Sequence, residues 1–236
     1  MIRSEKTTEQ RAGLVVTGGV VAMSVDGRDA AWRWERRDLV VVADRIVSAT
    51  FPVEGAEVIR AEGAFVVPLQ VESALRQGGR ARAIEARLEP ANPATFAVVR
   101  RRVTDQEIRR MLVVAPHDLE AVLVDGHIEA RDGRPVRAAG ADVADGAVSA
   151  TWVGVWSDVS RGLDQHLLPT GRYTETRGGR VDAYTGRYWV RGERISYLDD
   201  SGFWAFGELL GGVLHHAGFV MTRGAPHENG PTSTFG

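Results

Sequence analysis

The stretch LDDSGFWAFGELLGGVLHH, residues 198–216, carries ionisable side chains in a pattern that could do acid–base chemistry. Two adjacent acids, Asp199 and Asp200, precede a run rich in glycine and aromatic residues that ends in two adjacent imidazoles, His215 and His216. A carboxylate and an imidazole that are buried near one another have pKa values shifted toward neutrality, which suits proton transfer. The same residues could instead bind a metal ion, or only shape two strands and a turn.

Strand geometry separates these interpretations. Neighbouring residues of a strand point to opposite faces, so only one acid and one imidazole of the two pairs can face the same interior. With His166 this gives at most three metal ligands, so we expect no metal and no other cofactor. If Tyr197 faces inward, so does Asp199, and Asp200 is then expected to bond the backbone of the turn. The sequence favours an acid–base pair with Asp199, His215 and His216 as candidate catalytic residues.

A purely structural interpretation fits the same residues. The segment Asp199–Gly202 has the composition of a hairpin turn, and His215 or His216 can be an ordinary strand residue with satisfied hydrogen bonds.

The elements that must position these groups are short strands. Residues 150–224 contain many β-rich runs separated by turn dipeptides such as TG, GG and DDSG, which predicts an antiparallel meander that closes as a small barrel. Such a barrel is either filled by its side chains or holds one small ligand, and inward glycines such as Gly186 and Gly218 favour a cavity. The candidate ligand-binding residues are Trp152, His166, Tyr173, Tyr184, Tyr188, Tyr197, Phe203 and Trp204. Trp152, Trp156 and Tyr188 are equally compatible with a plain core.

A Gly-x-Trp motif stands at Gly154 and Trp156, and Arg223 ends the last predicted strand. This pair of features resembles the signature of lipocalin- and streptavidin-like (calycin) barrels. The resemblance implies that Trp156 closes one end of the barrel and that Arg223 stacks on it, a contact typically worth about 1–2 kcal/mol when sheltered from water. The whole segment from residue 152 to 223 resembles a small bacterial barrel family first known as hypothetical proteins from Agrobacterium. That resemblance implies a ligand-holding barrel but supplies no reaction.

The first half is also β-rich. From Gly13 to Val67, runs such as LVVT, DLVVVAD and AFVVP are broken by Gly, Asp and Pro, as is typical of strands. Thr104 stands three residues before Glu107, which predicts a helix that begins with a capping box. The dipeptide Asp125-Gly126 between two apolar runs predicts a type I′ hairpin.

The segments LVVTGGVVAM…AFVVPLQVE and DLEAVLVDGHIEARDGRPV resemble the two pieces of the β-sandwich found in the amidohydrolase superfamily. The resemblance covers residues 13–137. The segment between the two pieces is too short for the family's catalytic barrel, and Leu69-Gln70-Val71-Glu72 stands where the family has a metal-binding His-x-His. We therefore expect no active metal-dependent amidohydrolase, and expect the sandwich to serve packing or homodimerisation. His117 and His127 have no third ligand at suitable spacing.

These patterns predict an all-β protein: a small sandwich of truncated amidohydrolase type followed by an antiparallel calycin-like barrel. The expected boundaries are a disordered N-terminus (1–12), the sandwich (13–137), a linker (138–149), the barrel (150–224) and a disordered tail (225–236).

Composition limits the function further. The formal net charge is −2 and no long run of one sign occurs, so we expect no nucleic-acid partner. The chain has no cysteine, which excludes disulfides, thiolate metal sites and a cysteine nucleophile. The N-terminus lacks an apolar signal region and no run is long enough to span a bilayer, so we expect a cytoplasmic protein without membrane partners.

Three functions fit this sequence. The first is a cofactor-independent enzyme that binds an apolar or polycyclic molecule and cyclises or isomerises it by shape and acid–base catalysis. The second is a non-catalytic carrier, sensor or resistance protein with the same cavity. The third is a structural module whose barrel is filled by its own side chains.

Overall fold

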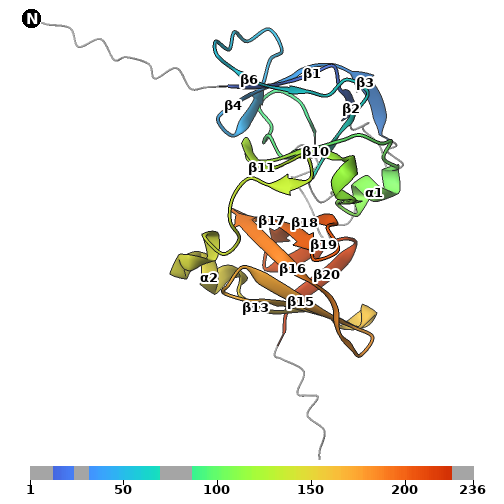
Figure 1. The fold of residues 1–236 in the computed structure, drawn as a ribbon, viewed down its shortest axis with the longest axis vertical. Coiled ribbons are helices and arrows are strands. Elements are labelled where there is room, and N and C mark those ends of the chain that lie inside the picture. Colours follow the sequence, from blue (N-terminus) through green and yellow to red (C-terminus); the bar gives the residue numbers. More distant parts are fainter. Residues whose placement is uncertain (1–12, 24–31, 70–86, 225–236) are drawn as a thin grey trace, which may run out of the picture. The chain divides into compact units, whose positions relative to one another are not determined.

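A computed structural model describes residues 13–23, 32–69 and 87–224 of the chain (Figure 1). The predicted disordered ends lie outside these residues, as do residues 70–72 of the segment that replaces the His-x-His motif.

The described chain forms two compact units. The sandwich unit comprises the described residues up to Arg109 together with Ala115–Val136, and the barrel unit comprises Arg110–Val114 together with the described residues from Arg137 onward. The all-β fold predicted from the sequence is confirmed. No helix within the described ranges has the length and apolar character needed to cross a membrane.

The sandwich unit contains two β-sheets. Their strands are β1 (Leu14–Thr17), β2 (Val20–Met23), β3 (Arg33–Arg36), β4 (Leu39–Val42), β5 (Arg45–Val47), β6 (Glu57–Arg60), β7 (Phe65–Pro68), β8 (Phe96–Val99), β10 (Leu119–Val124), β11 (His127–Arg131) and β12 (Arg134–Pro135). One sheet has the order β5-β4-β1-β6 and the other has the order β12-β11-β10-β8-β7-β2-β3. The β1–β6 and β2–β7 pairs are parallel, and the other neighbours are antiparallel.

A single apolar core joins the two sheets. Alternate residues of β1 and β4, such as Val16 and Leu39, meet Val21, Phe96 and Leu123 of the larger sheet in one buried cluster. Each fully buried side chain of this size stabilises the fold by about 1.5–3 kcal/mol. Burial alternates along β1, whereas all four residues of β8 are buried, so β8 is covered on both faces.

Two local predictions in this unit are confirmed. Helix α1 (Asp105–Arg109) begins with the expected capping box: the Thr104 N–H donates to the Glu107 carboxylate at 2.8 Å, and the Glu107 N–H donates to Thr104 Oγ1 at 3.3 Å. Asp125 and Gly126 have φ values of 48° and 75°, as a type I′ turn between β10 and β11 requires. A short 3₁₀ helix, η2 (Pro116–Asp118), precedes β10.

The barrel unit contains an eight-stranded antiparallel barrel. Its strands are β13 (Gly154–Asp158), β14 (Leu163–Leu167), β15 (Arg172–Arg177), β16 (Arg180–Arg191), β17 (Arg194–Asp199), β18 (Trp204–Leu210), β19 (Val213–His216) and β20 (Phe219–Arg223). Their order is β17-β16-β15-β14-β13-β20-β19-β18, and pairing of β17 with β18 closes the barrel. The connections therefore alternate between two ends. The turns after β15, β17 and β19 and the 3₁₀ helix η4 (Val159–Arg161) lie at one end, and Val153 and Arg223 lie at the other.

Much of the barrel interior is filled. Alternate residues of each strand form one buried cluster that includes Trp156, Leu163, Tyr188, Tyr197 and Met221. The glycines do not supply the open space that the sequence suggested. A side chain at Gly186 would clash with the Leu198 carbonyl oxygen, at 2.4 Å, and with the Tyr173 ring, at 2.7 Å, so this glycine allows the close approach of a backbone and an aromatic ring. Gly218, with a φ of 85°, lies in the turn between β19 and β20 and not on an inward strand face.

Residues 138–149, which we expected to be a linker, contain regular structure. The 3₁₀ helix η3 (Asp142–Ala144) places Val143 in the barrel core. Helix α2 (Gly146–Trp152) follows, and the Asp145 carboxylate caps it by accepting from two backbone N–H groups. Trp152 is thus the last residue of a helix and not part of the first barrel strand.

A further strand in the barrel unit comes from the first half of the sequence. Strand β9 (Val113–Val114) pairs with Trp204 and Ala205 of β18, beyond the point where β19 ends. Arg110, in the same segment, lies against Gly218. Residues 110–114 therefore extend the barrel wall at the end that carries the β19–β20 turn.

Candidate functional site

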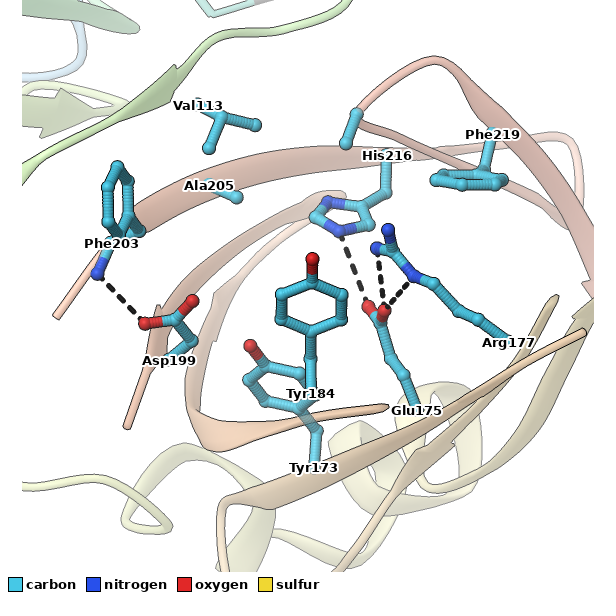
Figure 2. A pocket seen from close by; sticks show the side chains of 11 residues that line it. Val113, Tyr173, Glu175, Arg177, Tyr184, Asp199, Phe203, Ala205, His216 and Phe219 are labelled. Atoms are coloured by element: carbon cyan, nitrogen blue, oxygen red, sulfur yellow. Dashed lines mark hydrogen bonds and ion pairs between the residues drawn. The ribbon is translucent and has the colours of Figure 1, made fainter. Parts of the chain in front are cut away.

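A cavity of about 250 Å³ opens at the end of the barrel that carries the turns after β15, β17 and β19 (Figure 2). Its walls combine aromatic rings with two carboxylates, a guanidinium and an imidazole. The residues that line it are Val113, Tyr173, Glu175, Arg177, Tyr184, Asp199, Phe203, Ala205, His216, Ala217 and Phe219. All of them belong to the barrel unit.

Strand alternation explains how these groups reach one cavity. Tyr173, Glu175 and Arg177 occupy every second position of β15 and therefore share its inner face. Asp199 ends β17 two residues after the inward Tyr197, as the sequence predicted. His216 ends β19 two residues after the buried Leu214. The antiparallel order then brings the ends of β15, β17 and β19 to the same rim.

Glu175 is the buried carboxylate of the cavity, with 2% of its side chain exposed. Gln165 Nε2 donates to its Oε1 at 2.8 Å, and Arg177 Nε donates to its Oε2 at 2.8 Å. The Tyr197 hydroxyl donates to Gln165 Oε1 at 2.7 Å. Burial raises the pKa of Tyr197 well above its usual value, so this phenol keeps its proton and orients the Gln165 amide toward Glu175.

His216 is the buried imidazole. Its Nδ1 lies 3.1 Å from the Phe206 carbonyl oxygen, and its Nε2 lies 3.7 Å from Glu175 Oε1. A carbonyl only accepts, so Nδ1 carries a proton. Burial lowers the pKa of His216, which keeps the ring neutral at pH 7 and leaves Nε2 with a free lone pair. Nε2 and Oε1 are thus two acceptors that face one another across the cavity (Figure 2).

Arg177 forms the charged wall of the cavity. Its guanidinium pairs with Glu175 at 2.7 Å and lies 4.4 Å from the centre of the Tyr184 ring and 5.0 Å from that of Phe219. The Arg161 guanidinium lies 4.1 Å from the centre of the Phe219 ring. Stacked guanidinium groups and rings of this kind are attracted electrostatically, so they hold the rim of the cavity in shape.

Of the two acids of the opening motif, Asp199 both lines the cavity and bonds the turn, and Asp200 does neither. Asp199 Oδ1 accepts from the Ser201 hydroxyl at 2.7 Å and from the Phe203 N–H at 2.9 Å, so this inward residue also fixes the turn (Figure 2). Asp200 instead accepts two hydrogen bonds from Arg172 and one from Thr185. The prediction that Asp200 bonds the turn is therefore wrong, because the hydroxyl and N–H of the turn lie within reach of Asp199.

The predicted pair of Asp199 with a histidine is also replaced. Among the described contacts no hydrogen bond or ion pair joins Asp199 to His216, and the acid near the imidazole is Glu175. Sequence reasoning missed Glu175 although the signal was present: in RYTETR it follows Tyr173 by two residues and must share its face. Across the described chain no three His, Asp or Glu side chains come close enough together to hold a metal ion.

Of the other predicted ligand-binding residues, three line the cavity and five do not. Tyr173, Tyr184 and Phe203 are wall residues. Tyr188 and Tyr197 lie in the filled part of the barrel, where burial raises the pKa of Tyr188 to about 12. His166 and Trp204 alternate with inward neighbours, so they lie on the outer face, as does His215 of the histidine pair. The fifth residue, Trp152, packs in the core.

The opposite end of the barrel is closed. Arg223 lies over the Trp156 ring at 5.4 Å, the contact that the calycin resemblance implies, and donates to the carbonyl oxygens of Ala150 and Val153. The Trp156 indole N–H donates to the Trp152 carbonyl oxygen at 2.9 Å. Every polar group named at this end has a partner within the barrel unit.

Fold and site together define an antiparallel eight-stranded barrel that is packed at one end and hollow at the other. Residues 149–223 match the family described as Agrobacterium tumefaciens protein Atu4866. The solution structure of the protein Atu4866 from Agrobacterium tumefaciens is 47% identical in sequence, covers 31% of this chain and 95% of that chain, and gives a TM-score of 0.29. No curated protein matches the sequence.

The predicted resemblance of the C-terminal region to an Agrobacterium barrel family is confirmed. Val113 lies outside the matched residues, so one wall of the cavity comes from a segment that the family match does not contain. The resemblance of residues 13–137 to the amidohydrolase sandwich stays a prediction.

Proposed function

We propose that the barrel unit binds a small molecule in the cavity beside Glu175 and His216. The observation that carries this proposal is the cavity itself, into which two buried acceptors, His216 Nε2 and Glu175 Oε1, face 3.7 Å apart. Burial of polar groups is unfavourable by about 1–3 kcal/mol for each group that does not form its full set of hydrogen bonds. A barrel that only needed a stable core would be better served by apolar side chains at these two positions.

The size of the cavity narrows the ligand. A volume of about 250 Å³ is smaller than the roughly 300–1,000 Å³ of pockets that hold drug-sized ligands. It suits a molecule of one or two rings better than the polycyclic ligand expected from the sequence. Tyr173, Tyr184 and Phe219 supply ring faces for such a molecule.

Catalysis by proton transfer is the second step of the proposal. His216 is a neutral base whose Nδ1 proton is fixed by the Phe206 carbonyl, so Nε2 is oriented to remove a proton from a bound ligand. In an isomerisation one base suffices, because the proton taken from one atom is returned to another. This retains the expected cofactor-independent isomerase or cyclase, with His216 as base and Glu175 beside it in place of Asp199. A non-catalytic carrier is the alternative, and it needs only the cavity.

The test is a cavity-blocking variant. Ala205 lines the cavity, so Ala205→Phe should fill it and abolish binding of small aromatic fragments, detected by NMR shift changes in the residues of the wall. Val220→Phe is the matched control, because Val220 is half-exposed on the outer face of β20 and should leave fragment binding unchanged. Equal fragment binding by both variants and the unmodified chain would place binding elsewhere and overturn the proposal.

A second experiment separates enzyme from carrier once a ligand is found. His216→Asn should retain most of the affinity in a carrier, because the ring walls remain. In an enzyme the same variant should lose turnover by at least about a hundredfold while ligand still binds, since general base catalysis contributes that much.

A further inference from the structure

We infer that the ligand of the cavity is a small ring compound with a primary amino group whose nitrogen lies between His216 Nε2 and Glu175 Oε1. This inference rests on the proposed binding function and names the chemical class of the ligand. It follows from counting donors and acceptors in the innermost part of the cavity.

His216 offers one hydrogen-bond acceptor to the cavity. Its Nδ1 is bound to the Phe206 carbonyl at 3.1 Å, and only 5% of the side chain is exposed. The ring therefore presents Nε2 to the cavity as an acceptor. Figure 2 shows this nitrogen directed at Glu175 rather than at the rim.

Glu175 offers a second hydrogen-bond acceptor. Oε2 accepts from Arg177, and one lone pair of Oε1 accepts from Gln165. Gln165 cannot reverse its amide, because the buried Tyr197 hydroxyl donates to its oxygen. The remaining lone pair of Oε1 and the lone pair of Nε2 can therefore each accept one more hydrogen, and among the described residues no side chain donates it.

Geometry selects the donor. Two acceptors 3.7 Å apart can both be reached, at about 2.9 Å each, by a single atom that carries two hydrogens. A hydroxyl has only one hydrogen, so it satisfies one acceptor and leaves the other unpaired. Water, with two hydrogens, satisfies both acceptors while the cavity holds no ligand. A primary amine or the NH₂ group of an aromatic amine can displace that water and keep both hydrogen bonds.

Charge and shape agree with an amine. Glu175 and Asp199 bring two negative charges to the wall against the single positive charge of Arg177. The rings of Tyr173 and Tyr184 present faces beside Glu175, and such faces attract both flat rings and cationic groups. The position of the amine at the inner end leaves the ring of the ligand among these aromatic side chains.

The test compares probes of matched shape on the full-length chain. 2-Aminopyridine and benzylamine carry the two-hydrogen donor, whereas 2-(dimethylamino)pyridine and N,N-dimethylbenzylamine have lost it and benzyl alcohol has one hydrogen. Dissociation constants measured by NMR titration of cavity residues should be at least about tenfold lower for each primary amine than for its dimethylated partner. Benzyl alcohol should fall between them.

Variants locate the effect. In Glu175→Gln the Gln165 donor keeps an oxygen at the Oε1 position but the negative charge that attracts an amine is lost, so the preference for primary amines should largely disappear. Asp199→Asn removes a wall carboxylate that has no imidazole neighbour, and it should retain most of the preference. Because the probe pairs already discriminate in the unmodified protein, a Glu175→Gln chain that fails to fold does not remove the test.

The outcomes separate this inference from the function on which it rests. Equal or tighter binding of the dimethylated probes in the cavity overturns the amine inference and leaves the binding function standing. Failure of every probe, benzyl alcohol included, to perturb the cavity residues overturns both. Loss of the amine preference in Glu175→Gln with its retention in Asp199→Asn supports the inference.

Discussion

The two ends of the barrel each place an arginine against aromatic rings, but the two guanidinium groups have different partners. Arg223 lies over Trp156 and donates to backbone carbonyl oxygens, which have a fixed position and no charge to titrate. Arg177 lies against Tyr184 and Phe219 and pairs with Glu175, which lies beside His216. The difference indicates that the first end stabilises the fold, whereas the second maintains charged and titratable groups around an open space.

The largest effect is expected at the packed end. Trp156 is buried with 2% exposure, so Trp156→Ala should lower the free energy of unfolding of the barrel by about 3–5 kcal/mol through loss of packing and creation of a cavity. Tyr184 is 46% exposed, and Tyr184→Ala should lower it by less than about 1 kcal/mol. Urea denaturation monitored by NMR signals of the barrel measures both. Similar losses in the two variants would remove the distinction between the ends.

Replacing each arginine by methionine sharpens the comparison. Arg177→Met leaves a buried carboxylate without its cation and should lower the free energy of unfolding by about 2 kcal/mol. The loss is smaller than for a fully buried ion pair because Arg177 is about one-third exposed. Arg223→Met leaves two carbonyl oxygens without their donor and should lower the free energy of unfolding by about 1–2 kcal/mol.

His216 gives a prediction of its own about pH. Burial lowers the pKa of His216 in the folded chain below the unfolded value of 6.5. Between these two pKa values the unfolded chain binds more protons than the folded chain. The free energy of unfolding should therefore decrease as the pH is lowered through this range and level off below the folded pKa. Amine probes should also bind more weakly on acidification, because a protonated Nε2 becomes a donor. Histidine ¹⁵N NMR should show the Nδ1–H tautomer at pH 7, and a proton on Nε2 would contradict this account.

Much of the fold was predictable from the sequence because short-range chemistry specifies it. The Asp125-Gly126 turn, the Thr104 capping box and the run of short strands from Gly154 to Arg223 all formed as their residue types require. Trp152 is an exception. It ends a short helix that the Asp145 side chain caps, so it lies outside the first barrel strand.

The site was predictable only in part. Asp199, Tyr173 and Tyr184 line the cavity, and alternation accounts for Asp199 beside the inward Tyr197 because it depends on local geometry alone. It did not reveal which acid lies near which histidine, since that depends on the register between β15, β16, β17, β18 and β19, which no local signal encodes. Residues 110–114 were missed for the same reason, because β9 reaches the barrel only through long-range pairing.

Strand β9 allows the open end to be altered without a change to its buried charges. Val113 lines the cavity and is 45% exposed, so Val113→Lys should change the free energy of unfolding by less than about 0.5 kcal/mol. The new positive charge should weaken binding of benzylamine several-fold and affect benzyl alcohol less. Val220→Lys, on the outer face of β20, is the control in the same NMR titrations.

The smallest effect is expected for the acid that faces away from the cavity. Two hydrogen bonds from Arg172 and one from Thr185 lower the pKa of Asp200 to about 2, so its stabilisation is present above the unfolded value of 3.8 and is lost as the pH falls toward 2. Because the Asp200 side chain is about half exposed, solvent screens the pair. Asp200→Asn should therefore cost no more than about 0.5 kcal/mol at pH 7. Fragment affinity should be unchanged, and a tenfold loss would show that Asp200, and not Glu175, controls the open end.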